Sequence, residues 1–126
     1  SDLSLQAQSA GMESEMEISV CDKGGYLAVK ILEPRIDAAS AIQFKESLRP
    51  LATTGNGPVV LDLSNVVFLD SSGLGAVVAV MKLIGPDRKL ELAGLTPNVE
   101  KVFRLTRMDS VFRIHPAVPQ EPSHAG

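Results

Sequence analysis

Short apolar segments alternate with polar turns along most of the chain, and their period changes between that of strands and that of helices. Two runs rich in β-branched and apolar residues, 17–20 and 26–32, flank Asp22-Lys23-Gly24-Gly25. The paired glycines favour a hairpin, because glycine adopts a positive φ without strain. The pattern therefore predicts an antiparallel pair of strands at the start of the ordered chain.

A helix is predicted after this hairpin. Pro34 lacks the N–H that a β-ladder uses, so we expect strand pairing to stop there, and Asp37 is placed to act as the N-cap of a helix. The apolar positions of this helix recur at helical spacing and should form its buried stripe: Ala41, Phe44, Leu48 and Leu51. Pro50 should end or kink the helix, and residues 53–58 read as a loop.

The remainder of the chain continues the alternation. The run 59–63 is apolar apart from Asp62, which is typical of a central strand covered by helices. The further elements expected are a strand-side segment at 66–69, a helix from 70 to 84, a strand at 89–93, a helix beginning at Thr96-Pro97 and a strand at 111–114.

This order, β-β-α-β-α-β-α-β, predicts an α/β fold with right-handed crossovers. We expect a single domain at 15–115 with a mixed, largely parallel sheet of about five strands and helices packed against it. Residues 1–14 are interpreted as a flexible N-terminal arm or a cloning remnant, and residues 116–126 as a flexible C-terminal tail.

Composition and charge argue against several classes of partner. The net charge is -3 for 126 residues, whereas a nucleic-acid-binding domain normally displays a basic face. The one cysteine, Cys21, can form no internal disulfide, which fits a reducing cytoplasm. His115 and His124 have no acidic or cysteine partner at ligand spacing, and no apolar run approaches the roughly 20 residues of a membrane span. We therefore expect no metal, cofactor, nucleic acid or membrane as a partner.

The segment Asp70-Ser71-Ser72-Gly73 joins a strand to a helix and is the strongest candidate site. A helix N-terminus offers unpaired N–H groups and a partial positive charge, so a phosphate on a serine there is tolerated by its own helix. Asp70 and the serines are also good capping residues, and Gly73 and Gly75 permit tight turning and close approach by another molecule. The alternative is that the segment is only a well-capped helix start.

The helix that follows has two contrasting faces. At 100° per residue, one face should pack against the sheet with Leu74, Val77, Val78, Met81 and Ile84. The opposite face carries Ser72, Gly75, Ala76, Ala79 and Leu83, with only Lys82 near it. Small residues form a flat apolar patch, which is typical of an interaction surface. The alternative is that a loop or the tail covers this patch.

These segments together resemble the STAS domain family, and in particular the anti-sigma-factor antagonists of bacteria. The matching pieces, which with the strands span roughly residues 15–115, are Ile36-Asp37, Leu61-Asp62-Leu63, Phe68-Leu69-Asp70-Ser71-Ser72-Gly73-Leu74-Gly75, and Thr96-Pro97-Asn98-Val99 with Phe103. Two positions depart from the family pattern, which often has glycine where this chain has Pro34 or Arg35 and again where Arg107 follows Thr106.

The resemblance implies a binding switch. In that family the serine directly after the aspartate is phosphorylated by a partner kinase that also holds a sigma factor, and this serine corresponds to Ser71. The unphosphorylated protein would bind the anti-sigma factor/serine kinase and release the sigma factor, and a serine phosphatase is a possible further partner. The residues expected at the partner-binding site are Asp37, Asp70, Ser71, Ser72, Gly73, Gly75, Ala76 and Ala79.

Other functions have less support. A serine hydrolase using Ser71 or Ser72 needs a base within hydrogen-bond reach and lacks the Gly-x-Ser-x-Gly elbow, so we expect no enzyme. Phosphate or nucleotide binding at Gly73-Leu74-Gly75 lacks a P-loop lysine and a third glycine. The remaining alternative is a STAS scaffold or accessory module that binds other proteins without phosphorylation.

Overall fold

The computed structural model describes residues 16–53, 57–85 and 88–119. Its elements are β1 (Ile18–Asp22), β2 (Leu27–Ile31), β3 (Arg35–Ile36), α2 (Ala41–Leu48), the 3₁₀ helix η1 (Arg49–Thr53), β4 (Val59–Asp62), β5 (Phe68–Leu69), α3 (Ser71–Ile84), β6 (Leu90–Ala93), α4 (Pro97–Leu105), the 3₁₀ helix η2 (Met108–Ser110) and β7 (Ile114–His115). None of the helices in these described ranges is long and apolar enough to cross a bilayer.

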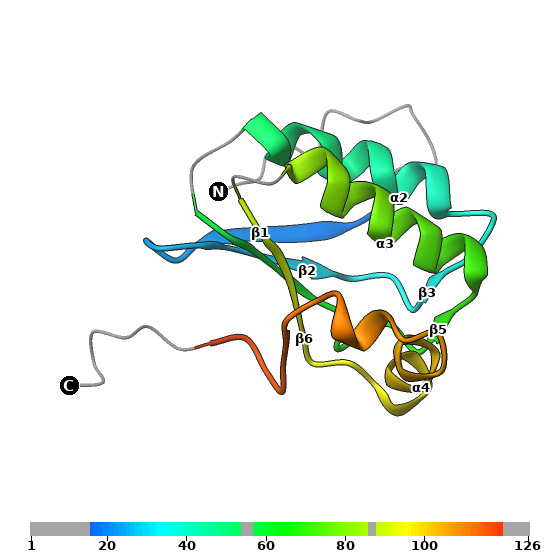
Figure 1. Cartoon of the computed structure of the whole chain (residues 1–126). Coiled ribbons are helices and arrows are strands. Elements are labelled where there is room, and N and C mark those ends of the chain that lie inside the picture. Colours follow the sequence, from blue (N-terminus) through cyan, green and yellow to red (C-terminus); the bar gives the residue numbers. More distant parts are fainter. Residues whose placement is uncertain (1–15, 54–56, 86–87, 120–126) are drawn as a thin grey trace.

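The main sheet has five strands in the order β1-β2-β4-β6-β7 (Figure 1). The first pair is the expected antiparallel hairpin, with Val20 opposite Val29, and its turn is closed by a hydrogen bond from the Lys23 N–H to the Tyr26 carbonyl at 2.9 Å. The pairs β2–β4, β4–β6 and β6–β7 are all parallel. The prediction of a mixed, largely parallel five-stranded sheet in an α/β fold is therefore confirmed.

A second, two-stranded sheet lies outside this prediction. β3 directly follows Pro34 and pairs in parallel with β5, placing Arg35 beside Phe68 and Ile36 beside Leu69. The expectation that strand pairing stops at Pro34 is wrong. Proline lacks the backbone N–H that donates a hydrogen bond, but it keeps the carbonyl that accepts one. Its carbonyl accepts a hydrogen bond from the Val67 N–H at 2.8 Å.

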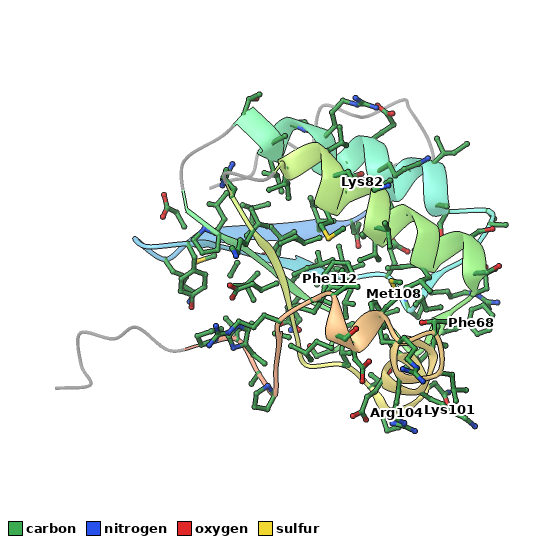
Figure 2. All side chains as sticks on the ribbon, in the orientation of Figure 1. Phe68, Lys82, Lys101, Arg104, Met108 and Phe112 are labelled. Carbon is green, nitrogen blue, oxygen red and sulfur yellow. The ribbon has the colours of Figure 1, made fainter. Side chains whose placement is uncertain are left out.

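The helices α2 and α3 pack against each other over one face of the main sheet (Figure 1). Between them and the sheet lies a continuous apolar core, in which Val29, Leu61 and Leu92 are fully buried on successive strands. α4 lies near β5 and η2, where the rings of Phe103 and Phe112 meet edge-to-face at 5.8 Å. The basic side of α4 is exposed, with Lys101 and Arg104 projecting outward (Figure 2).

Two element boundaries differ from the expectation. α2 begins at Ala41 with Ser40 as its N-cap, because Asp37 caps a turn that precedes the helix. The last strand is Ile114–His115 rather than 111–114, because η2 occupies Met108–Ser110 and the chain reaches the edge of β6 only afterwards. Three members of the predicted stripe, Ala41, Phe44 and Leu48, are buried on α2. The fourth, Leu51, is also buried but lies in η1, because α2 ends at Leu48, before Pro50.

The proposed tail is described only in part. At its beginning the Tyr26 hydroxyl donates a hydrogen bond to the carbonyl of Pro119, which ties residues after β7 to the start of β2. Residues 120–126 of the predicted tail, and all of the predicted N-terminal arm at 1–14, lie outside the described residues.

Candidate phosphorylation and docking site

The site is built on the first turn of α3, which begins immediately after β5. Asp70 is the N-cap: its backbone is extended, its Oδ1 accepts a hydrogen bond from the Gly73 N–H at 2.9 Å, and its carbonyl accepts from the Leu74 N–H at 2.8 Å. The predicted capping role of Asp70 is confirmed.

The other carboxylate oxygen of Asp70 reaches a second segment of the chain. Oδ2 accepts a hydrogen bond from the Ala38 N–H at 3.2 Å, in the turn between β3 and α2. The pairing of β3 with β5 brings these segments together, because Ile36 lies beside Leu69. The sequence gives no signal for this contact, since 32 residues separate the two partners.

Asp37 organises that same turn. Its Oδ1 accepts hydrogen bonds from the N–H groups of Ala39 and Ser40 at 3.1 and 3.2 Å, and its Oδ2 accepts from Arg35 Nε at 3.3 Å. Burial acts to raise the pKa of Asp37, but the Ser40 hydroxyl and N–H and the Arg35 guanidinium together hold that pKa below its ordinary value. Asp37 is therefore an ionised turn cap in the loop beside the N-terminus of α3.

Ser71 and Ser72 are both exposed, as the first and second residues of α3. The N–H groups of a first helical turn have no partner within the helix, and the helix dipole favours negative charge there. Chemically, this position offers an accessible hydroxyl whose phosphate would be electrostatically compatible with its own helix.

Gly73 has a different role from the one expected. It is buried, and a Cβ at this position would lie 2.0 Å from the carbonyl oxygen of Ile36. Glycine is therefore required by the close approach of α3 to β3 within the protein, not by the approach of another molecule. Gly75, in contrast, is exposed with no atom near its Cβ position.

The buried face of α3 is rotated from the predicted one. Its buried residues are Gly73, Ala76, Val77, Val80 and Ile84. Ala76, expected on the exposed partner-binding face, is only 3% exposed and belongs to the core. The physical reason is that α3 packs against β3 and α2 as well as the main sheet, so its small residues lie where neighbouring elements come closest.

An exposed face with small residues remains on α3 after this correction. Ser72, Gly75 and Leu83 are exposed and Ala79 is partly exposed, whereas Val78 and Met81 are partly buried against the core. We refer to Ser71, Ser72, Gly75, Ala79 and Leu83 as the α3 face. Asp37 and Asp70, both partly exposed, lie beside its N-terminal end.

The structure also exposes an apolar residue near this site, Phe68, that was not among the predicted partner-binding residues. Phe68 of β5 is 42% exposed, and the guanidinium carbon of Arg35 lies 5.2 Å from the centre of its ring. Its neighbour Val67 is 52% exposed. The sequence pattern that could have predicted this exposed apolar surface is the four-residue apolar run at 66–69. Only two residues of that run form the strand β5.

The chain belongs to the STAS domain family, whose sequence model matches residues 18–121. This is a family of binding proteins rather than enzymes. Among curated relatives, an anti-sigma-B factor antagonist of Staphylococcus aureus is 25% identical over 105 residues, which cover 82% of this chain and 94% of that protein.

Solved structures share the fold. An anti-sigma factor antagonist from Mycobacterium paratuberculosis superposes with a TM-score of 0.73 at 24% identity, covering 84% of this chain and 90% of that one. The antagonist SpoIIAA in its unphosphorylated form gives a TM-score of 0.63 at 17% identity, covering 86% and 93% of the chains. The phosphorylated form of the Bacillus protein SpoIIAA gives 0.55 at 16%, covering 87% and 96%.

Proposed function

We propose that this protein is an anti-sigma-factor antagonist that acts in the bacterial cytoplasm and is switched off by phosphorylation of Ser71. The observation that carries the proposal is the position of Ser71, an exposed serine at the first residue of α3, directly after a cap that is hydrogen-bonded on both carboxylate oxygens. The relatives named as antagonists of anti-sigma factors support the role, and the two solved forms of SpoIIAA support a phosphorylated state for this fold.

The switch follows from electrostatics. Unmodified, the α3 face and the turn around Asp37 dock on an anti-sigma factor that is also a serine kinase, which frees the sigma factor. A phosphate on Ser71 adds about -1.5 to -2 charges at pH 7 beside Asp70. At the middle of a docked interface this charge would be desolvated and would repel acidic groups of the partner. The fold tolerates the same charge, because it lies at the N-terminus of α3.

The first test identifies the modified residue. The protein is incubated with ATP and each anti-sigma factor of the serine-kinase type from the same genome, and its intact mass is measured. We expect the addition of one phosphate to the wild type and to Ser72→Ala, and none to Ser71→Ala. Phosphate found on Ser72 or Thr96 by peptide mapping would contradict the assignment.

The second test separates binding from folding. Ser71→Ala should bind the anti-sigma factor constitutively, and Ser71→Asp should bind at least about tenfold more weakly, which corresponds to about 1.4 kcal/mol. Thermal unfolding should be nearly unchanged in Ser71→Asp, because an anion at a helix N-terminus is worth about 0.3–1 kcal/mol in favour of the fold. Equal binding of both variants in the absence of any phosphate transfer would instead favour a phosphorylation-independent scaffold.

A further inference from the structure

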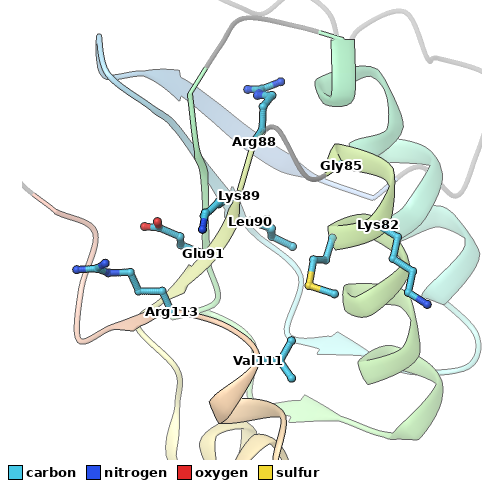
Figure 3. A pocket seen from close by; sticks show the side chains of 9 residues that line it. Lys82, Gly85, Arg88, Lys89, Leu90, Glu91, Val111 and Arg113 are labelled. Atoms are coloured by element: carbon cyan, nitrogen blue, oxygen red, sulfur yellow. The ribbon is translucent and has the colours of Figure 1, made fainter.

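The two edges of the main sheet are protected to different degrees. β7, at one edge, has only two residues, with Arg113 directly before it and Pro116 directly after it. The side chain of Arg113 is directed away from α3 (Figure 3). Short strands, charged side chains and proline are the features that keep the edge of a sheet from pairing with another chain. The β7 edge is therefore a poor template for a further strand.

The edge formed by β1 has less protection. This strand has five residues without proline or lysine, and its one charged residue, Asp22, is the last. Val20, at its centre, is 46% exposed. Within the described part of the chain, β1 pairs with β2 alone. An edge strand of this length with an exposed apolar centre is a template for pairing with another strand.

The hydrogen bonds of the hairpin determine which backbone groups of β1 face outward. The Glu17 carbonyl accepts from the Leu32 N–H at 3.0 Å, and the Lys23 N–H donates to the Tyr26 carbonyl at 2.9 Å. In an antiparallel pair, residues that bond to the partner strand alternate with residues that point the other way. The odd-numbered residues of this segment therefore bond to β2. The backbone groups directed at the open edge belong to the even-numbered residues Ile18, Val20 and Asp22.

A second copy of β1 is complementary to this edge. When two β1 strands pair antiparallel about Val20, the two Val20 residues exchange both of their backbone hydrogen bonds, and Ile18 of each copy pairs with Asp22 of the other. The same register places Glu17 opposite Lys23 on both sides of the two-fold axis. Cross-strand pairs of opposite charge stabilise a sheet. Among the described residues, no other register of the two strands places opposite charges face to face.

The two charged residues are available for this pairing. In the described ranges, no hydrogen bond or ion pair of its side chain engages Glu17 or Lys23. Glu17 is exposed and Lys23 is partly exposed. Each copy therefore brings one acidic and one basic group to the edge, at the two ends of β1.

We propose that this protein forms a two-fold symmetric dimer through β1, in which the main sheets of two copies join into one continuous sheet. The partner is a second copy of this chain, selected by the Val20 pair at the axis and by the two pairs of Glu17 with Lys23. Such an interface is isologous, so it closes after two copies and leaves no unpaired β1 edge. β1 contains no residue of the α3 face, and the dimer does not depend on the proposed antagonist function.

The first test measures association of the full chain by sedimentation velocity. The wild type should dimerise with increasing concentration. Val20→Arg places two like charges opposite each other at the axis and should weaken dimerisation at least about tenfold. Val111→Arg makes the same change at a valine that is 49% exposed outside β1, and should dimerise normally. A wild type that stays monomeric up to about 1 mM, or an equal loss in both variants, would overturn the proposal.

Charge exchange tests the pairs of Glu17 with Lys23. Glu17→Lys and Lys23→Glu each place like charges face to face, and each should weaken its own dimer at least about fivefold. An equal mixture of the two variants restores both pairs of opposite charge and should dimerise as the wild type does. The two positions lie about 20 Å apart along one strand, so no pair within a chain explains such a rescue. A mixture that associates no better than either variant alone would overturn the proposal.

Cross-linking tests the register. In the proposed dimer Ser19 lies opposite Cys21 of the other copy, in a non-hydrogen-bonded pair whose Cα atoms are about 4.5 Å apart, within reach of a disulfide. Both residues are exposed. Ser19→Cys should therefore form a covalent dimer on mild oxidation. The wild type and the double variant Ser19→Cys with Cys21→Ser should not, because their thiols lie two residues out of register. No covalent dimer with Ser19→Cys, or one in either control, would contradict the proposed pairing.

Discussion

Asp70 acts through both oxygens of its carboxylate. One caps α3 at Gly73 and the other holds the turn after β3 at Ala38. A good N-cap needs only the first of these bonds. The second bond makes Asp70 a link between the two segments that carry Ser71 and Asp37, so its contribution extends from the helix to the geometry of the site.

Asp70→Asn tests this double role. The asparagine oxygen can still accept from the Gly73 N–H, but its NH₂ group would then face the Ala38 N–H, where two donors meet. We expect a loss of about 1 kcal/mol in the free energy of unfolding, measured by urea denaturation, together with slower phosphorylation of Ser71. Full retention of stability would show that the bond to Ala38 contributes nothing.

The two glycines of α3 lie in opposite environments although they are only two residues apart. Gly73 packs against the backbone of β3, whereas Gly75 faces open space in the same helix. Their difference comes from the direction in which each Cα–H points and not from helix propensity.

We predict that Gly73→Ala destabilises the protein by about 1–3 kcal/mol, because the new methyl group overlaps the Ile36 carbonyl and forces α3 away from β3. Gly75→Ala should instead stabilise it by up to about 1 kcal/mol, the difference in helix propensity between the two residues. Thermal and chemical unfolding of the pair measure both effects. Similar changes in the two variants would mean that α3 does not approach β3 this closely.

A non-glycine residue with a positive φ lies just after the C-terminal end of α4. Arg107 follows the helix with φ 66° and ψ 14°, the left-handed conformation that glycine adopts without cost. This is the position at which the family often has glycine. Arg107 therefore adopts the left-handed conformation that glycine would adopt, at a cost in backbone strain.

Arg107→Gly should stabilise the protein by about 0.5 kcal/mol. A non-glycine residue in the left-handed region costs about 1–2 kcal/mol. The greater freedom of glycine in the unfolded chain offsets about 0.4–1 kcal/mol of that gain. Arg104→Gly, inside α4, is the control and should lose about 1 kcal/mol. Differential scanning calorimetry measures the stability of both variants. A loss of stability in Arg107→Gly would contradict the claim that the backbone at Arg107 is strained.

In the whole molecule, the main sheet and α2 cover one side of α3 and leave the α3 face outward. The pairing of β3 with β5 then brings the Asp37 turn to the end of this face where Ser71 begins. The candidate docking surface therefore combines a helix with a turn that lies more than thirty residues earlier in the chain.

Gly75→Arg tests this surface in the assembled protein. The side chain points into solvent, so stability should change by no more than about 1 kcal/mol, and binding of the anti-sigma factor should fall at least about tenfold. Val20→Arg introduces the same charge at an exposed apolar residue of β1 and should bind normally. Isothermal titration calorimetry measures both, and normal binding by Gly75→Arg would place the docking surface elsewhere.

The sequence by itself determined the features that depend on neighbouring residues. Turn chemistry, capping and periodicity within one element predict the Gly24-Gly25 hairpin, the cap at Asp70 and the apolar residues of α2. They also predict the strand at 59–63, which forms at Val59–Asp62. The family resemblance then identified Ser71 as the candidate phosphorylation site. Local chemistry alone could not distinguish such a site from a helix start that is merely well capped.

Only the tertiary structure decided how the elements meet. It set the rotation of α3 that buries Gly73 and Ala76, the pairing of β3 with β5, the bond from Asp70 to Ala38 and the pair of Glu91 with His115. Hydrophobic periodicity identifies an apolar side of a helix but not which neighbours cover it, because small residues are buried wherever two backbones approach closely. Contacts between residues distant in the chain depend on strand order and docking, which no local pattern encodes.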